Sequence, residues 1–186
     1  MKYYQKNYEK YIDNTINLDM SEIYQMFEVH LKPGDKILDV GFGSGRDMLY
    51  FRKKYEIFGI DNVDEFVKNA KQNGLNVKKE SVTNITYFEE FDGIWACASL
   101  LHIHRKYIKK VFKKLCNALK VQGVLYASFK YGNFHGNRGE RYFNDFNEIK
   151  IRKYLKGTGF KILDYKITDD IRPDREQKWL NLILIK

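Results

Sequence analysis

The sequence predicts an α/β fold, a three-layer sandwich in which helices cover both faces of a mostly parallel sheet. Short apolar runs alternate with amphipathic segments along the chain, and one run leads into a glycine-rich turn. The last two apolar runs are joined by only about ten residues, too few for a helical crossover. With 186 residues, of which 44% are hydrophobic and 31% charged, the chain suits one folded domain.

The helices are predicted from apolar periodicity and capping signals. Residues 8–31 are expected to be helical with a break around 14–19, and Ser21 is the expected N-cap of the second segment. A helix begins near Met48, and another covers 64–73 and ends at Gly74. An apolar stripe over 108–119 marks the next helix. Before a helix that ends near 157, Asn144 or Asp145 followed by Glu148 resembles a capping box.

The strands are predicted from short apolar runs. They are expected at 37–40, 57–60, 75–79, 91–99, 124–129, 160–167 and 179–185. The run 91–99 is nearly all apolar, as expected for a strand that is covered on both faces. The short link between the last two strands makes them antiparallel neighbours, so the sheet should be mixed with an antiparallel edge.

The most informative segment is Leu38–Asp47, which reads LDVGFGSGRD. Strand, glycine turn and helix in this order place a ligand at the carboxyl end of the sheet. Glycines allow a tight turn and a close approach of the ligand to the backbone. A dinucleotide fingerprint would need glycine at position 46, where Arg46 stands, and the Gly-Lys-Ser/Thr ending of a phosphate-binding loop is missing.

This segment resembles motif I of the class I S-adenosylmethionine-dependent methyltransferases, an acidic residue followed by Gly-x-Gly-x-Gly, here Asp39, Gly41, Gly43 and Gly45. The resemblance extends to 32–36, 92–95, 119–125 and the closing strand pair. The layout is similar to small bacterial enzymes of the tellurite-resistance methyltransferase type. The resemblance implies a Rossmann-like sheet of order 3-2-1-4-5-7-6, transferase activity, S-adenosyl-L-methionine as cofactor and S-adenosyl-L-homocysteine as product. We expect a single methyltransferase domain over 1–186, with a helical lid (1–31) on a core (32–186).

The cofactor-binding residues are expected around the glycine turn and at the neighbouring strand ends. A carboxylate about 20 residues beyond the glycines, at Asp61, suits the ribose hydroxyls, although a helix N-cap is an alternative role. Phe42 departs from the small residue or cysteine of many members. Where members often have an acidic residue after the third strand, the candidates here are Ser81 and Val82. Tyr11 is a candidate contact, with ordinary helix packing as the alternative. The full set is Tyr11, Asp39, Gly41, Phe42, Gly43, Gly45, Arg46, Asp61, Asn62, Ser81, Val82 and Cys97.

The predicted catalytic residue is His102, which follows the fourth strand. Methyl transfer requires alignment of the nucleophile and, for some acceptors, removal of a proton. Imidazole titrates near neutral pH and suits the task of a general base. The alternative is that His102 caps or packs the next helix, and His104 is expected at the surface or at the start of that helix.

The acceptor is expected to meet two segments, a flexible loop over 130–143 and the link 168–175. The predicted substrate-binding residues are Lys130, Tyr131, Arg138, Arg141, Arg172 and Arg175. Their arginines could form a fork for a carboxylate, a phosphate or a related oxyanion. Alternatively, Arg172 and Arg175 pair with the aspartates at 169, 170 and 174.

The charge balance leaves the partner open. With 33 Lys and Arg against 24 Asp and Glu, the formal charge of +9 suits nucleic acid, an anionic small molecule or a merely solvated surface. The leading hypothesis is methyl transfer to a small polar or anionic metabolite. An RNA (tRNA) methyltransferase is the second hypothesis and a noncatalytic cofactor-binding module the third. Strand four ends without the Asn/Asp-Pro-Pro-aromatic signature, which weakens base N-methylation.

The sequence also suggests the compartment. No apolar run could span a bilayer and the first residues lack a signal-peptide core, so a cytoplasmic protein without membrane association is expected. The cysteines, Cys97 and Cys116, suggest free buried thiols and not a disulfide framework. No metal site is expected, because no cluster of carboxylates and histidines suggests one, and the oligomeric state stays open.

Overall fold

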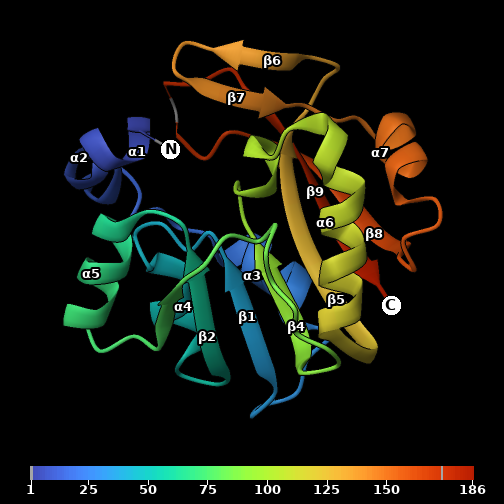
Figure 1. Ribbon diagram of the computed structural model, residues 1–186, viewed down its shortest axis with the longest axis horizontal. Helices are drawn as coiled ribbons and strands as arrows, with labels where there is room; N and C mark the ends of the chain where they lie inside the picture. Colours follow the sequence, from blue (N-terminus) through green and yellow to red (C-terminus); the bar gives the residue numbers. More distant parts are fainter. Residues whose placement is uncertain (1, 173) are drawn as a thin grey trace.

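The computed structural model describes residues 2–172 and 174–186; Met1 and Pro173, which the predicted domain and the predicted 168–175 link include, lie outside the described residues. Seven strands form one sheet: β1 (Lys36–Val40), β2 (Glu56–Asp61), β3 (Val77–Lys79), β4 (Phe91–Ala96), β5 (Leu119–Lys130), β8 (Lys161–Asp169) and β9 (Lys178–Ile185). Their spatial order is β3-β2-β1-β4-β5-β9-β8 (Figure 1). Only β9 runs antiparallel to its neighbours, β5 and β8. The predicted strand order and antiparallel last strand are confirmed.

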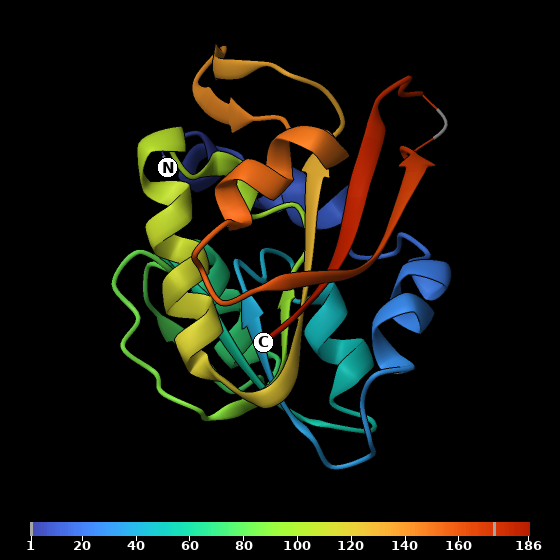
Figure 2. The same ribbon diagram turned by 90° about the vertical axis from the view of Figure 1, so that its right-hand side faces the viewer.

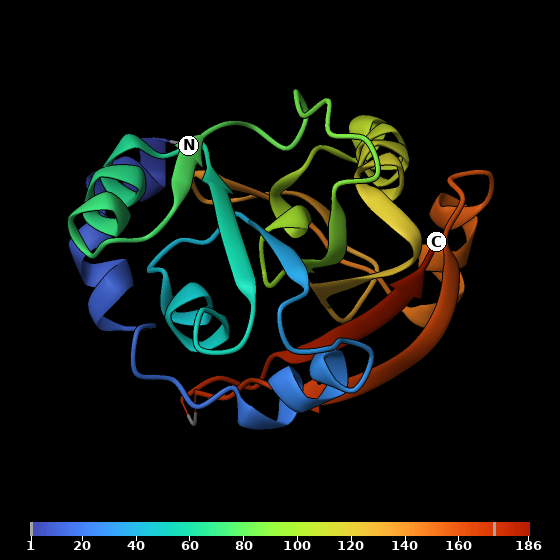
Figure 3. The ribbon, with the colours of Figure 1, turned by 90° about the horizontal axis from the view of Figure 1, so that it is seen from below.

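Helices cover both faces of this sheet. They are α1 (Lys2–Lys6), α2 (Tyr8–Asp13), α3 (Ser21–Glu28), α4 (Arg46–Phe51), α5 (Asp64–Gln72), the short 3-10 helix η1 (Leu100–His102), α6 (Arg105–Ala118) and α7 (Glu148–Leu155). The helices α6 and α7 lie on one face, and α3, α4 and α5 lie on the other (Figures 1 and 3).

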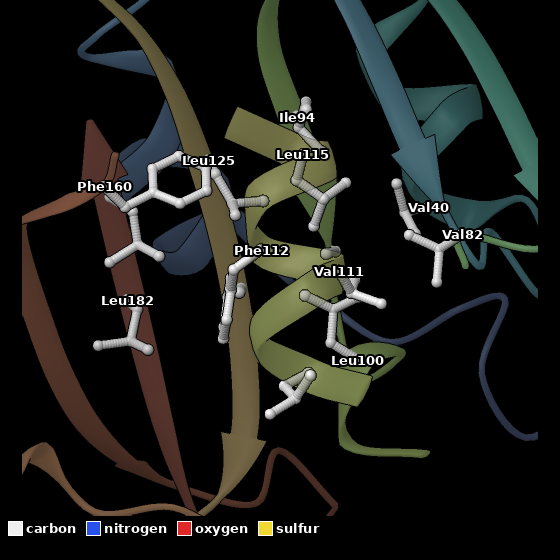
Figure 4. Close-up of a cluster of buried hydrophobic side chains, with 14 of the residues drawn as sticks. Val40, Val82, Ile94, Leu100, Val111, Phe112, Leu115, Leu125, Phe160 and Leu182 are labelled. Carbon is white, nitrogen blue, oxygen red and sulfur yellow. The ribbon is translucent and has the colours of Figure 1, made fainter. Parts of the chain in front are cut away.

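Each face buries its own apolar cluster. On the α6 side, Val111, Phe112 and Leu115 pack over strand residues such as Ile94 and Leu125 (Figure 4). Their spacing of one, three and four residues places them on the same side of a helix, which is why the apolar stripe of the sequence becomes the buried face. On the opposite side, Phe27 of α3 is fully buried against Phe51 and Trp95. The helix α3 is therefore part of the core.

A small two-stranded sheet lies above the carboxyl ends of the parallel strands. It is the hairpin of β6 (His135–Arg138) and β7 (Arg141–Asn144), seen at the top of Figures 1 and 2. The prediction of a flexible loop over 130–143 is therefore wrong. An ion pair between Arg138 and the buried Asp145 ties the hairpin to the body of the protein, and Gly139 supplies the positive φ of the turn.

Two predicted helix caps are also wrong. Met20 precedes α3 as its cap residue, and Ser21 is the first helical residue, with its hydroxyl donating to Asp19. Asn147 caps α7, because its Oδ1 accepts a hydrogen bond from Lys150 N at 2.8 Å. The side chains of the predicted candidates, Asn144 and Asp145, instead accept hydrogen bonds from Arg105 and Arg138, respectively.

Within residues 2–172 and 174–186, none of the helices has the length and apolar character needed to cross a lipid bilayer.

Candidate active site

Two adjoining cavities open at the carboxyl ends of the parallel strands. The first cavity, about 150 Å³, lies beside the ends of β1 and β2; the second, about 410 Å³, extends over β5, β9 and β8. Five residues line both and form their shared wall: Tyr4, Tyr11, Gly41, Ala98 and His102. A group bound in one cavity can therefore reach a group bound in the other only past this wall.

The glycine turn between β1 and α4 has no room for side chains. Gly41 and Gly43 have φ values of 74° and 54°, a region that other residues avoid. A Cβ on Gly43 would lie 2.9 Å from Tyr11 Cε1, and one on Gly41 would lie 2.6 Å from Ser99 Cβ. Gly45 differs, because it lies against Leu75 and lines neither cavity. With a φ of 78°, Gly45 is the N-cap residue of α4.

The carboxylate of Asp61 anchors the first cavity. Its side chain is nearly buried, and burial raises its pKa while backbone amides lower it. The Oδ2 atom accepts from Gly43 N at 3.1 Å and Oδ1 from Val63 N at 2.9 Å. Each oxygen keeps a free lone pair, as two vicinal hydroxyls would require. The alternative role as helix N-cap is not what the structure shows, since Val63 occupies that position of α5.

Two buried polar atoms around the glycine turn have no hydrogen-bond partner among the described residues, Asp39 Oδ2 and Ser99 Oγ. A buried polar atom without a partner is costly, so atoms of this kind suit a site that a polar ligand completes. Burial and the neighbouring Asp47 raise the pKa of Asp39 well above its ordinary value. The donor set, the Cβ-free turn and these two atoms fit a nucleoside cofactor with a charged tail.

The rest of the first cavity contains predicted residues and one that was missed. Asn62, Ser81 and Val82, three of the predicted cofactor residues, line it. Glu80, which directly follows β3, lines it too, with its carboxylate held by Tyr87 Oη at 2.7 Å. An acidic residue directly after the third strand was the signal sought in the sequence, and Glu80 occupies that place, but Ser81 and Val82 were chosen instead.

His102 lies in the shared wall as a neutral base. Its Nδ1 is 2.7 Å from the Tyr142 carbonyl oxygen, which only accepts, so the proton is on Nδ1. Its Nε2 accepts from the Tyr4 hydroxyl at 2.7 Å. Burial lowers the pKa of His102 to about 4, helped by the positive charges of Arg141 and Lys130. His104, and not His102, caps α6.

Tyr4 is a site residue that sequence reasoning missed. Its hydroxyl donates to His102 and lies 3.3 Å from Arg141 Nη1. Burial raises the pKa of Tyr4, so its hydroxyl keeps its proton. The tyrosine-rich start of the chain was the available signal, but only Tyr11 was chosen from it. Tyr11 packs against Gly43 and, at 5.2 Å between ring centroids, against Phe66.

The turn after β4 has an unusual backbone. The predicted strand 91–99 ends at Ala96, and Ala98 has a φ of 49°. A hydrogen bond of 2.8 Å from Ala98 N to Ser128 Oγ holds this conformation. Strain of this kind persists where the surroundings impose it, and here it places Ala98 in the wall between the cavities.

The second cavity contains some of the predicted substrate-binding residues but not all of them. Lys130, Arg141, Arg172 and Arg175 line it. Arg138 lies outside, paired with Asp145 at 3.0 Å between Nη1 and Oδ1, and the Tyr131 hydroxyl donates to Glu148 at 3.1 Å. Arg172 binds Asp170 through Nε at 3.0 Å, as the alternative prediction stated.

Three predicted cofactor residues lie on the side of the second cavity, which Phe42, Arg46 and Cys97 line. Arg46 pairs with Asp47 at 2.6 Å and reaches the Thr15 carbonyl at 3.4 Å, which ties the N-terminal segment to the glycine turn. Burial raises the pKa of the Cys97 thiol to about 12. No group of three or more His, Cys, Asp or Glu side chains within the described ranges is placed to hold a metal ion.

Part of the chain is similar in sequence to known methyltransferases. A family model described as a methyltransferase domain matches residues 37–123. A phosphoethanolamine N-methyltransferase of Plasmodium falciparum (isolate 3D7) is 26% identical over 136 residues, 68% of this chain and 50% of that protein. An erythromycin 3''-O-methyltransferase of Saccharopolyspora erythraea is 32% identical over 107 residues, 51% of this chain and 34% of that protein. The chain thus spans half or less of the length of these relatives.

A solved structure shares the whole fold. The 1,6-didemethyltoxoflavin-N1-methyltransferase of Burkholderia thailandensis, with bound 1,6-didemethyltoxoflavin and S-adenosylhomocysteine, superposes with a TM-score of 0.83 at 20% identity. The match covers 100% of this chain and 86% of that one. At this identity the likeness shows the fold alone.

Proposed function

Residues 37–123 form a methyltransferase domain of the class I, S-adenosylmethionine-dependent type, and on that premise we propose that the protein transfers a methyl group to a small polar or anionic molecule. The observation that carries the proposal is the pair of cavities that meet at His102. The first suits the cofactor. The second suits the acceptor, because Lys130, Arg141 and Arg175 line it without an ion-pair partner among the described residues.

The cofactor would be held by the residues around the first cavity. Asp61 would accept hydrogen bonds from the ribose hydroxyls, and Ser81 and Val82 would lie along the adenine. Asp39 and Ser99 carry the polar atoms without partners, and they would face the charged amino-acid end. When bound, S-adenosylmethionine supplies a methyl group on a positively charged sulfur.

The chemistry of the chain itself is proton removal and alignment. The Nε2 atom of His102 carries the basic lone pair, which accepts the Tyr4 hydroxyl proton, and the Tyr142 carbonyl fixes this tautomer. Tyr4, whose hydroxyl donates to this base, lines the second cavity together with His102. An acceptor N–H or O–H that donates to Tyr4 would pass its proton through that hydroxyl to His102 as the nucleophile bonds to carbon.

The first two helices would act as a lid. Tyr4 of α1 and Tyr11 of α2 line both cavities, whereas α3 packs into the core. We therefore propose a lid over residues 2–13, narrower than the 1–31 expected from the sequence. Its closure would exclude water from the shared wall.

A labelling assay tests this function. The purified protein is incubated with methyl-labelled S-adenosylmethionine and cell extract, and label is counted in small-molecule, RNA and protein fractions. We expect label in the small-molecule fraction, reduced about 10²- to 10⁴-fold in His102→Gln and less in Tyr4→Phe.

Both variants should bind S-adenosylhomocysteine as the wild type does, because neither change removes a residue proposed to hold the cofactor. Label that appears only in nuclease-sensitive RNA would favour the second hypothesis of the sequence, an RNA methyltransferase. Cofactor binding without label in any fraction would favour the third, a noncatalytic module.

A further inference from the structure

Positive side chains gather around one aromatic ring at the mouth of the second cavity. Lys130 Nζ lies 4.8 Å from the centre of the Phe143 ring, and the guanidinium carbons of Arg138 and Arg141 both lie 5.1 Å from it. Cations that surround one ring repel one another unless negative charge compensates them. The hairpin residue Phe143 thus stands at the centre of a cation cluster.

Compensation within the protein is incomplete. One member of the cluster, Arg138, has a carboxylate partner. It binds Asp145 with both of its terminal nitrogens. Within residues 2–172 and 174–186, Lys130 and Arg141 make no ion pair with a carboxylate, and neither does Arg175 across the cavity. Burial lowers the pKa of Lys130, and Arg138, Arg141 and Arg175 lower it further. The positive charges of Arg141 and Arg175 therefore both act on Lys130, and all three residues line the same cavity.

Arg141 of this cluster is also preorganised, and it lies close to Tyr4 and His102. The Arg141 guanidinium stacks over Tyr3 at 4.4 Å, and its Nη1 lies 3.3 Å from the Tyr4 hydroxyl that donates to His102. A guanidinium that is already held by aromatic rings loses little freedom when it binds an anion. An anion bound by Arg141 would therefore lie close to an acceptor atom that is hydrogen-bonded to Tyr4.

We propose that Lys130, Arg141 and Arg175 bind a doubly charged oxyanion of the phosphate-ester type, carried by the methyl acceptor itself. This inference rests on the proposed function. Three unpaired cations around one cavity exceed the single charge of a carboxylate, and a tetrahedral group offers three oxygens to three separate donors. The acceptor would then be a compact molecule with its nucleophilic atom a short spacer away from the phosphate.

Titration with inorganic phosphate tests the binding site without any turnover. By calorimetry on the protein saturated with S-adenosylhomocysteine, we expect the wild type to bind phosphate and acetate to bind much more weakly. Lys130→Gln and Arg141→Gln should each weaken phosphate binding about tenfold or more, while the affinity for S-adenosylhomocysteine stays unchanged. The control Lys113→Gln removes an exposed charge of α6 and should bind phosphate as the wild type does. No binding of phosphate, or an equal loss in the control, would overturn the site.

A second arm tests whether the anion belongs to the acceptor. The small-molecule fraction of the extract is treated with alkaline phosphatase, which is then removed, before the labelling assay. We expect the labelled product to disappear, and inorganic phosphate to compete with the untreated fraction but not with S-adenosylmethionine. Undiminished label after phosphatase treatment would overturn the assignment. Absence of label from the untreated fraction would contradict the proposed function instead, while the titration would still decide the anion site.

Discussion

The two carboxylate oxygens of Asp61 each accept one backbone hydrogen bond, from Gly43 and from Val63. An asparagine would keep the shape of this side chain but would turn one acceptor into a donor that faces an N–H group. Hydrogen bonds to charged groups are the stronger kind, so Asp61→Asn should weaken binding of S-adenosylhomocysteine about 10- to 100-fold. Isothermal titration measures this change.

A matched control is Asp64→Asn, three positions along. Asp64 pairs with Lys79 on the surface, and its side chain is 43% exposed. The change should leave the affinity for S-adenosylhomocysteine unaltered. Equal losses in the two variants would speak against a specific role of Asp61.

The depressed pKa of His102 has a consequence for stability. Its value of about 4 in the folded protein lies below its ordinary value of 6.5, so as the pH falls the unfolded chain binds this proton first. The contribution to stability is complete above pH 6.5 and is lost between 6.5 and about 4, at up to about 1.4 kcal/mol per pH unit.

Urea unfolding of the wild type and of His102→Gln, at pH 7 and pH 5, measures this effect. Between these two values the wild type should lose about 2 kcal/mol more free energy of unfolding than the variant does. Losses of the same size would show that His102 titrates normally in the folded protein.

At the scale of elements, the β6–β7 hairpin is held in part by the ion pair between Arg138 and Asp145. The Arg138 side chain is 36% exposed and that of Asp145 only 3%, so solvent screens the pair in part. Asp145→Asn should lower the local stability of the hairpin by about 1–2 kcal/mol. Amide hydrogen exchange should become faster over 135–144, and methyl transfer should fall because β7 carries Arg141.

Binding of S-adenosylhomocysteine should survive this change, because the first cavity lies on the other side of the shared wall. Glu140→Gln, at the exposed turn of the hairpin, is the control and should alter neither exchange nor transfer. Faster exchange throughout the large sheet would indicate global destabilisation and not opening of the hairpin.

At the scale of the whole molecule, the excess positive charge is unevenly distributed. The helix α6 carries six Lys and Arg residues and no acidic one, and it lies on the face away from α3 (Figure 3). A surface of this kind attracts polyanions regardless of what the cavities hold. It is the feature that keeps RNA as a second hypothesis for the acceptor.

Removing this charge separates the two hypotheses. The fourfold replacement of Lys106, Lys109, Lys110 and Lys113 by Gln should leave transfer to the small-molecule fraction within about twofold of the wild type, because the cavities keep their own cations. Binding of RNA should weaken and lose part of its dependence on salt. A parallel loss of methyl transfer would indicate that a polyanion is the acceptor.

The sequence alone was sufficient for the fold, and it brought the glycine turn and Asp61 to the same end of the sheet. The alternation of apolar runs and amphipathic helical stripes can be recognised from the spacing of nearby residues. The antiparallel edge follows from a link that is too short for a helical crossover. The glycine turn and Asp61 lie at the ends of successive strands, so their meeting follows once the strands are parallel. Glu80 was missed although the predicted strand 75–79 ends where β3 ends, because Ser81 and Val82 were chosen in its place.

The acceptor side was decided by the tertiary structure. The sequence does not show which arginines form ion pairs. In the structure, Arg138 pairs with Asp145 and Arg172 with Asp170, whereas Arg141 makes no ion pair among the described residues. The bond between Tyr4 and His102 joins residues 98 positions apart. Such contacts depend on how distant segments come together above the sheet, and no periodicity along the chain encodes that arrangement. Local chemistry therefore determined the scaffold, and long-range packing determined which side chains are free to act.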